Sequence, residues 1–225
     1  MSISLAVHHD SSPLQLLPDI VAIAGFTGRD QEAVAEHLVE LRELGVPTPS
    51  STPCFYQSAP ESLVQTDTIT VVGSNTSGEA ECVVIEHRGE RFLTLGSDHT
   101  DRAAEAIDIP LSKLACPKPI AGTAWRIDDI TDHIGEIELR SWIDDGDGEV
   151  LYQEGVVRDF MPLDEIITTT PFRRQPESFA LFCGTLAAIG GIRPSPTFRA
   201  ELRDPITGNV IELAYRTVVA DYLDL

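Results

Sequence analysis

The stretch GEAECVVIEHRGERFLTLGSDH, residues 78–99, predicts a β-hairpin and thereby points to the fold class. The apolar, β-branched run CVVIEH precedes Arg88-Gly89, and the similar run RFLTLG follows it. A glycine-containing turn between two such runs is typical of a hairpin. With Arg88-Gly89 at the tip, the numbers of paired residues add up to about 177.

Three carboxylates would then meet at the open end of this hairpin. Asp98 would lie opposite Glu79, and Glu79 and Glu81 would share one face because side chains alternate along a strand. Carboxylates this close repel each other unless a proton or a cation lies among them. Such oxygen ligands suit Mg²⁺ or Mn²⁺, with Ca²⁺ as a further candidate. The alternative is a solvated strand end in a very acidic protein, and the spacing alone leaves both interpretations open.

The composition limits the classes of partner. The chain has 225 residues, of which 16 are basic and 36 acidic, so its formal net charge is −20. This charge argues against nucleic acid or an anionic membrane as a partner. Lys113 and Lys118 are the only lysines. We find no repeat and no linker, so we expect one domain over residues 1–225, with residues 1–18 as an N-terminal strand or arm.

The sequence also predicts a cytoplasmic protein. The first 20 residues lack the basic start and the long apolar run of a signal peptide. No stretch approaches the 18 apolar residues that a membrane-spanning helix needs. The four cysteines are widely scattered and form no C-x-x-C pair, so a zinc knuckle is not expected.

The remaining pattern indicates many strands and few helices. Residues 19–28 (DIVAIAGFTG) read as a buried strand, and residues 29–45 as a helix with Thr27 or Asp30 as its cap and Gly45 at its end. PLDEIITTT indicates a second helix. Further short strands are expected in CFYQ, TITVVG, IGEIELRSWID, EVLYQEG, TFRAELRDP and NVIELAYRTVVADYL. The expected fold is therefore α+β and β-rich, a mixed or antiparallel β-roll or β-sandwich.

Two further features are candidates for chemistry. His37 and Glu40 are three residues apart on the first helix, and a carboxylate beside an imidazole is the arrangement that a general base needs. The alternative is a half-buried histidine whose hydrogen bond goes to a nearby glutamate. Lys113 and Lys118 lie in the segment LSKLACPKP, and a lysine beside a metal site can bind a substrate carboxylate or stabilise an enolate, but a single lysine is more often a surface group.

Taken in order along the chain, these segments resemble the fumarylacetoacetate hydrolase superfamily. AVAEHLVE is similar to its helix motif, SGEAECVVI to its E-x-E strand, and GSDHTDR to its G-x-D-x-[ST]-A-R-D motif. LSKLACPKPIAGTAW, GEVLYQEGVVRDF and CGTLAAIGGI are similar to its lysine segment, its glutamine strand and its T-G-T-P loop. The resemblance covers roughly residues 19 to 220 and implies an FAH-like fold.

The resemblance implies a role for each matching residue. The metal ligands are Glu79, Glu81 and Asp98, the catalytic residues are His37, Glu40 and Lys113, and the substrate contacts are Arg102, Gln153 and Thr185. Some family positions differ here: Gln57 replaces a lysine, Ala103 an aspartate and Leu186 a proline. These differences mostly concern substrate contacts, so no particular substrate carries over.

The implied activity is metal-dependent hydrolysis of a carbon–carbon bond in a small anionic 2-oxo acid of the β-dicarbonyl type, such as an acylpyruvate. In this mechanism His37, oriented by Glu40, deprotonates a water, and Lys113 stabilises the enolate that leaves. The alternatives are a lyase or isomerase with the same platform, namely a decarboxylase or a sugar-acid dehydratase, and a metal- or ligand-binding protein without turnover. The resemblance also implies a homodimer.

Overall fold

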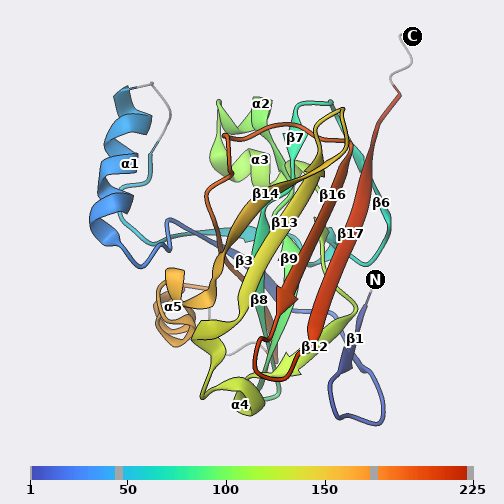
Figure 1. Ribbon diagram of the computed structural model, residues 1–225. Coiled ribbons are helices and arrows are strands. Elements are labelled where there is room, and N and C mark those ends of the chain that lie inside the picture. The colour runs from blue at the N-terminus through green and yellow to red at the C-terminus, as the bar shows by residue number, and fades with distance from the viewer. Residues whose placement is uncertain (1, 44–47, 173–176, 222–225) are drawn as a thin grey trace.

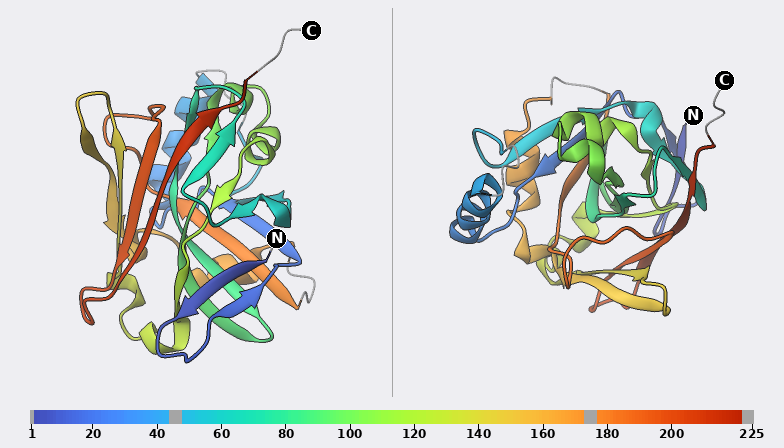
Figure 2. Two further views of the ribbon diagram at one scale, coloured as in Figure 1. Left: turned by 90° about the vertical axis from the view of Figure 1, so that its right-hand side faces the viewer. Right: turned by 90° about the horizontal axis from the view of Figure 1, so that it is seen from above.

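The computed structural model describes residues 2–43, 48–172 and 177–221, apart from the side chains of residues 37, 40 and 41. In this part of the chain two β-sheets pack face to face, and Figure 2 shows the two layers edge-on. Four strands of the smaller sheet, β13 (Glu138–Asp144), β14 (Glu149–Val156), β16 (Thr197–Arg203) and β17 (Val210–Val219), lie in front in Figure 1. Behind them lie β3 (Ile20–Gly25), β8 (Ala80–His87) and β9 (Glu90–Ser97) of the larger sheet.

Both sheets are mixed. The larger one has, in spatial order, β2 (Leu14–Leu16), β1 (Ile3–Val7), β12 (Thr123–Arg126), β9 (Glu90–Ser97), β8 (Ala80–His87), β15 (Ser178–Thr185), β3 (Ile20–Gly25) and β4 (Cys54–Ser58). The smaller one has β14 (Glu149–Val156), β13 (Glu138–Asp144), β16 (Thr197–Arg203), β17 (Val210–Val219) and β6 (Thr68–Val71). Parallel pairs β1–β12, β3–β15 and β6–β17 interrupt otherwise antiparallel ladders. The predicted β-rich α+β class is confirmed.

Two short ladders complete the strands near the open end of the hairpin. They pair β7 (Thr76–Ser77) with β10 (Thr100–Asp101) and β5 (Leu63–Val64) with β11 (Lys118–Pro119). Both were too short for periodicity to reveal. The strand expected from residue 134 begins later, at Glu138, because Ile134–Glu136 forms a 3-10 turn.

The described helices are short except for the first. They are α1 (Gln31–Glu43), α2 (Arg102–Glu105), α3 (Ile109–Ala115), α4 (Ile127–Ile130) and α5 (Leu163–Thr169). Asp30 caps α1, because its Oδ1 accepts hydrogen bonds from the amides of Glu32 and Ala33. The predicted helices α1 and α5 are confirmed, whereas Gly45, the expected end of α1, lies outside the described residues. In Figure 1, α1 stands beside the two sheets.

The helices α2 and α3 were not predicted from the sequence, although each carries a capping signal. Asp101 accepts from the amides of Ala103 and Ala104, and Asp108 accepts from the amide of Leu111. With four and seven residues they are shorter than the window in which helical periodicity can be recognised. They lie beside β7 at the top of Figure 1. They therefore enclose the end of the hairpin at which the carboxylates lie.

Both faces of β8 are buried, which explains its continuous apolar run. Cys82 and Val84 belong to the core between the two sheets. Val83 and Ile85 face a second apolar cluster, which also contains residues of β1, β3 and β15. A strand covered on both faces has no reason to alternate with polar residues.

The predicted hairpin register is confirmed. Ala80 pairs with Ser97 and His87 with Glu90, so paired numbers do add up to 177. Arg88 and Gly89 both have positive φ, at 51° and 85°, as a two-residue type I′ turn requires. This turn fixes the pairing, and the pairing in turn fixes which side chains meet at the open end.

Residues 2–18 form β1 and β2, which pair with each other, and β1 also pairs with β12. The expected N-terminal strand is thus present. Among the helices of the described residues, none combines the length and the apolar character needed to cross a membrane.

Candidate metal centre

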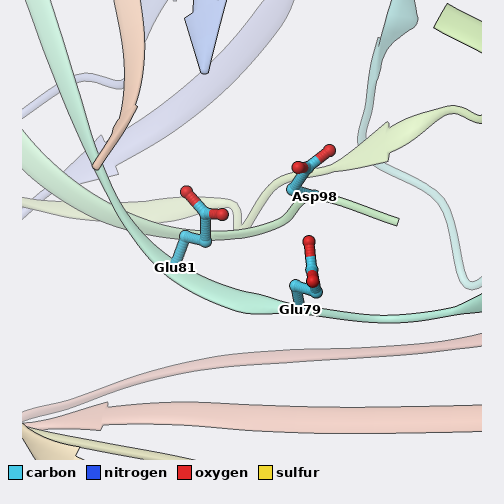
Figure 3. A group of neighbouring side chains, drawn as sticks. All are labelled: Glu79, Glu81 and Asp98. Carbon is cyan, nitrogen blue, oxygen red and sulfur yellow. The ribbon is translucent and has the colours of Figure 1, made fainter. Parts of the chain in front are cut away.

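Glu79, Glu81 and Asp98 converge at the open end of the hairpin. Glu79 precedes β8 and Asp98 follows β9, and the amide of Asp98 donates a 3.0 Å hydrogen bond to the carbonyl of Glu79. One oxygen of each carboxylate lies within 4.8 Å of the others. Figure 3 shows the three side chains on the same side of the hairpin.

These carboxylates do not form a solvated strand end. Asp98 is 0% and Glu81 2% exposed, and Glu79 is largely buried. Burial of ionised carboxylates costs several kcal/mol each unless charges or hydrogen bonds compensate for it. The partners of each carboxylate therefore decide what this site can hold.

Asp98 contacts both lysines of the chain. Its Oδ2 lies 2.5 Å from Nζ of Lys113, and its Oδ1 lies 2.8 Å from Nζ of Lys118. Burial alone would raise the pKa of Asp98, but the two ammonium groups outweigh burial and lower it to about 2. Lys118 is itself 0% exposed and also donates to the carbonyl of His99 at 2.7 Å. Asp98 is thus ionised and firmly held.

Glu79 is paired with two different cations. Its Oε2 lies 3.1 Å from Nζ of Lys113, and its Oε1 lies 2.9 Å from Nη2 of Arg102. Burial acts to raise the pKa of Glu79, but Lys113 and Arg102 together lower it below its ordinary value. Lys113 thus bridges two of the three predicted metal ligands. Burial would lower the pKa of Lys113, yet Asp98 and Glu79 raise it, so this amine is positively charged.

Glu81 has a weaker set of partners. Its Oε2 accepts a 2.8 Å hydrogen bond from the amide of Gly184, and no cation pairs with it among the described residues. Burial first, and then the negative charges of Asp98 and Glu79, raise the pKa of Glu81 well above its ordinary value. One carboxylate of the three therefore lacks a compensating positive charge.

Gly184 is suited to this position for a steric reason. Its φ is +98°, and a Cβ there would lie 1.9 Å from Oγ1 of Thr27. Only glycine adopts this conformation readily and leaves the space that Thr27 occupies. The glycine of the CGT segment therefore directs its amide at Glu81.

The donor set fits a hard divalent cation. Three carboxylates within ligand-sharing distance offer the oxygen atoms that Mg²⁺, Mn²⁺ and Ca²⁺ prefer. Glu81 is buried beside Asp98 and Glu79 and has no paired cation among the described residues. A divalent cation bound by the three carboxylates would stabilise the ionised form of Glu81.

Gln153 and Thr185 connect the hairpin to its neighbours. Oε1 of Gln153 accepts from the amide of Ala80 and from Ser141, at 3.0 and 2.8 Å. Its Nε2 donates to Oγ1 of Thr185 and to the carbonyl of Leu186, both at 2.7 Å. Thr185 in turn donates to the carbonyl of Ala80 at 2.9 Å. These contacts fix β8 between Glu79 and Glu81, while a role in substrate binding remains a prediction.

Arg102 is anchored in a similar way. Besides Glu79 it contacts Ser77 at 2.7 Å through Nε and Glu105 at 2.6 Å through Nη1. Its pKa is raised, because the carboxylates of Glu79 and Glu105 outweigh the effect of burial. Arg102 thus pairs with one of the three carboxylates, and its contact with substrate stays a prediction.

A buried hydrogen-bond network supports the other side of Asp98. The hydroxyl of Tyr215 lies 2.9 Å from Nδ1 of His99 and 2.8 Å from Oγ of Ser97. Ser97 Oγ also accepts from the amide of Glu79 at 3.2 Å. Burial first, and then Lys118 and Arg102, lower the pKa of His99 to about 3. A neutral imidazole therefore links the smaller sheet to the metal hairpin.

A cavity of about 660 Å³ adjoins the three carboxylates. Glu79, Glu81, Asp98, Lys113 and Arg102 contribute to its wall. Gln153 and Thr185 also line it, as do residues at the start of α1, in α3 and after β15. Its volume lies within the ~300–1,000 Å³ that small-molecule sites typically have.

The predicted dyad cannot be placed in the same detail. Positions 37 and 40 fall within α1, but the side chains of His37 and Glu40 lie outside the described residues. Ala33 and Val34, one turn earlier in α1, line the cavity. The role of His37 and Glu40 thus remains a prediction.

A family model described as "Protein of unknown function (DUF2848)" matches residues 24–215. The chain belongs to this family. The match includes every predicted site residue, from His37 to Thr185. No curated protein matches the sequence.

Solved structures reveal what this DUF2848 chain shares with better-known folds. A 2-keto-3-deoxy-D-arabinonate dehydratase is similar with a TM-score of 0.64 and 15% identity, over 95% of this chain and 79% of that one. A yeast protein of the fumarylacetoacetate hydrolase family has a TM-score of 0.64 and 15% identity, over 89% of this chain and 93% of that one. A 5-carboxymethyl-2-hydroxymuconate delta-isomerase from Mycobacterium smegmatis is similar with a TM-score of 0.59 and 13% identity, over 93% of this chain and 80% of that one. The resemblance to the fumarylacetoacetate hydrolase superfamily is thereby confirmed for the fold.

Several site residues of the DUF2848 chain were missed by sequence reasoning. Lys118, Glu105, His99 and Tyr215 all contact the predicted ligands or their partners. The signal available for Lys118 was its place in the segment LSKLACPKP, which also contains Lys113. Tyr215 is 116 positions away from its partner His99, and no local pattern connects the two.

Proposed function

We propose that the protein is a cytoplasmic, divalent-metal-dependent hydrolase of a carbon–carbon bond in a small β-dicarbonyl 2-oxo acid. The observation that carries the proposal is the convergence of three buried carboxylates beside a cavity large enough for such a compound. The cytoplasmic location is supported by the four cysteines, all of which are free. The fold is shared with a dehydratase whose structure was solved with magnesium and 2,5-dioxopentanoate, at a TM-score of 0.62 and 14% identity.

In the proposed reaction each residue has a defined task. Glu79, Glu81 and Asp98 would hold Mg²⁺ or Mn²⁺, which supplies Lewis-acid polarisation of the 2-oxo group. Lys113, whose ammonium contacts two of these ligands, offsets negative charge that develops on the substrate oxygens. The imidazole of His37, oriented by Glu40, would take a proton from the water that attacks the distal carbonyl. The carbon–carbon bond beside that carbonyl then breaks to give a carboxylic acid, and the 2-oxo acid leaves as an enolate that takes up a proton.

The metal site can be tested without a substrate. A ligand present at a hundred times its Kd stabilises the folded state by ~2.7 kcal/mol, which raises the melting temperature by about 5–10 °C for a chain of this size. Mg²⁺ or Mn²⁺ should produce this shift in the wild type and not in Glu81→Ala. Glu86→Ala, at the other end of the same strand, is the matched control and should keep it. A melting curve indifferent to both metals at millimolar concentration would contradict the site.

A lyase is the second candidate, because a dehydratase and an isomerase are among the proteins that share the fold. Acylpyruvates and oxaloacetate, incubated with Mn²⁺, separate the two reactions by their products. His37→Ala should reduce hydrolysis by roughly 10²–10⁴-fold, whereas decarboxylation does not need a water base and should survive. Full hydrolytic activity in His37→Ala would reject the water-activation mechanism. Metal binding with no turnover of any compound would favour a binding protein.

We also propose that the protein is a homodimer. Leu111 and Leu114 on α3 and Ile107 just before it are large apolar side chains that are more than half exposed. Such a patch is typical of an interface. Light scattering at micromolar concentration should give twice the chain mass of 24.5 kDa, and a mass near 24.5 kDa would contradict the proposal.

A further inference from the structure

One part of the cavity wall carries the three carboxylates, and another part is largely apolar. The apolar part limits which substrates can bind. Beside the carboxylates, much of the lining is apolar and comes from α1, α3 and the segment after β15. The residues used here are Val34, Ile109, Leu186, Ala188 and Ile192. Ile192 is 56% exposed, which places it where the cavity meets solvent. A ligand held at the carboxylates would therefore extend along apolar side chains.

Two of the three basic side chains in the described lining of the cavity are paired with carboxylates. Lys113 and Arg102 pair with Glu79 and with Asp98 or Glu105. Arg29, the third basic residue of the described lining, is exposed and donates from Nε to the carbonyl of Phe160.

The acidic lining residues outnumber these cations. Besides the three predicted ligands they are Asp30, Glu105 and Asp159. Arg29 is the one cation of the described lining for which no ion pair with a carboxylate is found. A second carboxylate on the substrate would thus still meet an excess of negative charge in the lining. An excess of like charge disfavours binding of such a substrate.

The amide and hydroxyl side chains beside the carboxylates are engaged within the protein. Each polar side-chain atom of Gln153 has a protein partner, and the hydroxyl of Thr185 both donates and accepts. Thr27 donates to the carbonyl of Cys183. These side chains therefore support the shape of the cavity and leave its apolar wall to determine what extends from the oxo-acid group.

From this lining we infer that the site selects 2-oxo acids with an uncharged, apolar substituent distal to the oxo-acid group over dicarboxylates. The inference rests on the proposed function, since the metal centre is taken to hold the oxo-acid group. It adds the chemical class of the remainder of the substrate, which the proposed function leaves open.

Calorimetric titration of the Mn²⁺-loaded protein tests the inference by binding alone. Oxalate serves as the head group without a substituent. Pyruvate, 2-oxobutanoate, 2-oxopentanoate and 2-oxohexanoate form the apolar series, and oxaloacetate, 2-oxoglutarate and 2-oxoadipate carry a terminal carboxylate. Affinity should rise about fourfold per buried methylene in the first series. The dicarboxylates should bind at least tenfold more weakly than the apolar acids of similar length.

A substitution at the mouth of the cavity sharpens the test. Ile192→Lys adds a cation to the apolar wall, and it should raise the affinity for 2-oxoadipate at least tenfold while the affinity for oxalate stays the same. Ile206→Lys is the matched control, because Ile206 is 63% exposed but does not line this cavity. It should leave every affinity unchanged.

The outcomes separate this inference from the proposed function. Oxalate that binds only with metal, together with affinities that do not depend on chain length or that favour dicarboxylates, would overturn the inference and leave the proposed function standing. Failure of oxalate to bind the Mn²⁺-loaded protein would overturn both.

Discussion

The two ends of the β8–β9 hairpin carry similar charged residues in opposite surroundings. At the turn, Arg88 pairs with Glu177 at 2.6 Å, and their side chains are 72% and 61% exposed. At the open end, Lys118 pairs with Asp98 at 2.8 Å, and neither side chain is more than 1% exposed. Water screens the first pair, whereas the second depends on its protein partners alone. The difference shows that burial, more than residue type, separates a surface ion pair from a candidate centre for chemistry.

The largest loss of stability is expected from a substitution at the buried, open end of the hairpin. Lys118→Met keeps the apolar stem but leaves Asp98 with one cation and the carbonyl of His99 without its donor. Loss of one partner from a buried pair costs ~3–5 kcal/mol. Urea denaturation in the presence of a chelator should show this loss in the free energy of unfolding. Asp98→Asn in the Lys118→Met background should recover part of it, since the buried carboxylate that lost its second cation is then absent. A loss below ~1 kcal/mol would mean that water reaches Lys118.

Asp204 extends the comparison to a buried carboxylate without like-charged neighbours. It accepts from the amides of Ile206 and Thr207 and from the hydroxyl of Thr207, and it pairs with His133 at 3.0 Å. Burial would raise the pKa of Asp204, but these hydrogen bonds outweigh it and lower the pKa to about 2. Asp204 therefore needs no cation from outside, in contrast to Glu81.

The pH dependence of stability should reveal this difference. A carboxyl group whose pKa is lower in the folded than in the unfolded state stabilises the fold above its unfolded pKa, and this contribution is lost as the pH falls through the folded pKa. Asp204→Asn should therefore cost about 1–3 kcal/mol at neutral pH. The deficit relative to the wild type should shrink between about pH 4 and pH 2. Unfolding free energies measured across this range check the prediction, and a deficit that does not change with pH would contradict it.

The smallest loss of stability is expected from a substitution at the turn. Arg88→Ala removes an exposed pair and should change the free energy of unfolding by ~0.5 kcal/mol or less. The same urea series that includes Lys118→Met measures it. A loss comparable to that of Lys118→Met would abolish the distinction between the two ends of the hairpin.

The hairpin and its carboxylates could be predicted because local rules determine them. The turn at Arg88 and Gly89 sets the register, and the register places Glu79, Glu81 and Asp98 together. The start of α1 was predictable in the same way, from the cap residue Asp30. In each case the deciding residues lie close together in the sequence.

The surroundings of the carboxylates were harder to predict because they come from distant segments. Lys118 reaches Asp98 from β11, and Tyr215 reaches His99 from β17 in the other sheet. Glu81 accepts a hydrogen bond from the amide of Gly184, which is 103 positions away. Such contacts depend on the packing of the whole fold, and residue spacing contains little information about that packing. Sequence reasoning therefore found the three carboxylates, and through the resemblance Lys113 and Arg102, but not Lys118 or the network of His99 and Tyr215.

The position of the two lysines has a practical consequence for chemical labelling. Lys113 is largely buried, Lys118 is fully buried, and the sequence contains no other lysine. Amine-directed acylating reagents thus find no ε-amine on the surface of this protein. Incorporation of label at Lys113 and Lys118, followed by mass spectrometry, would measure how often the centre opens to solvent and would serve as an intrinsic probe of its motion.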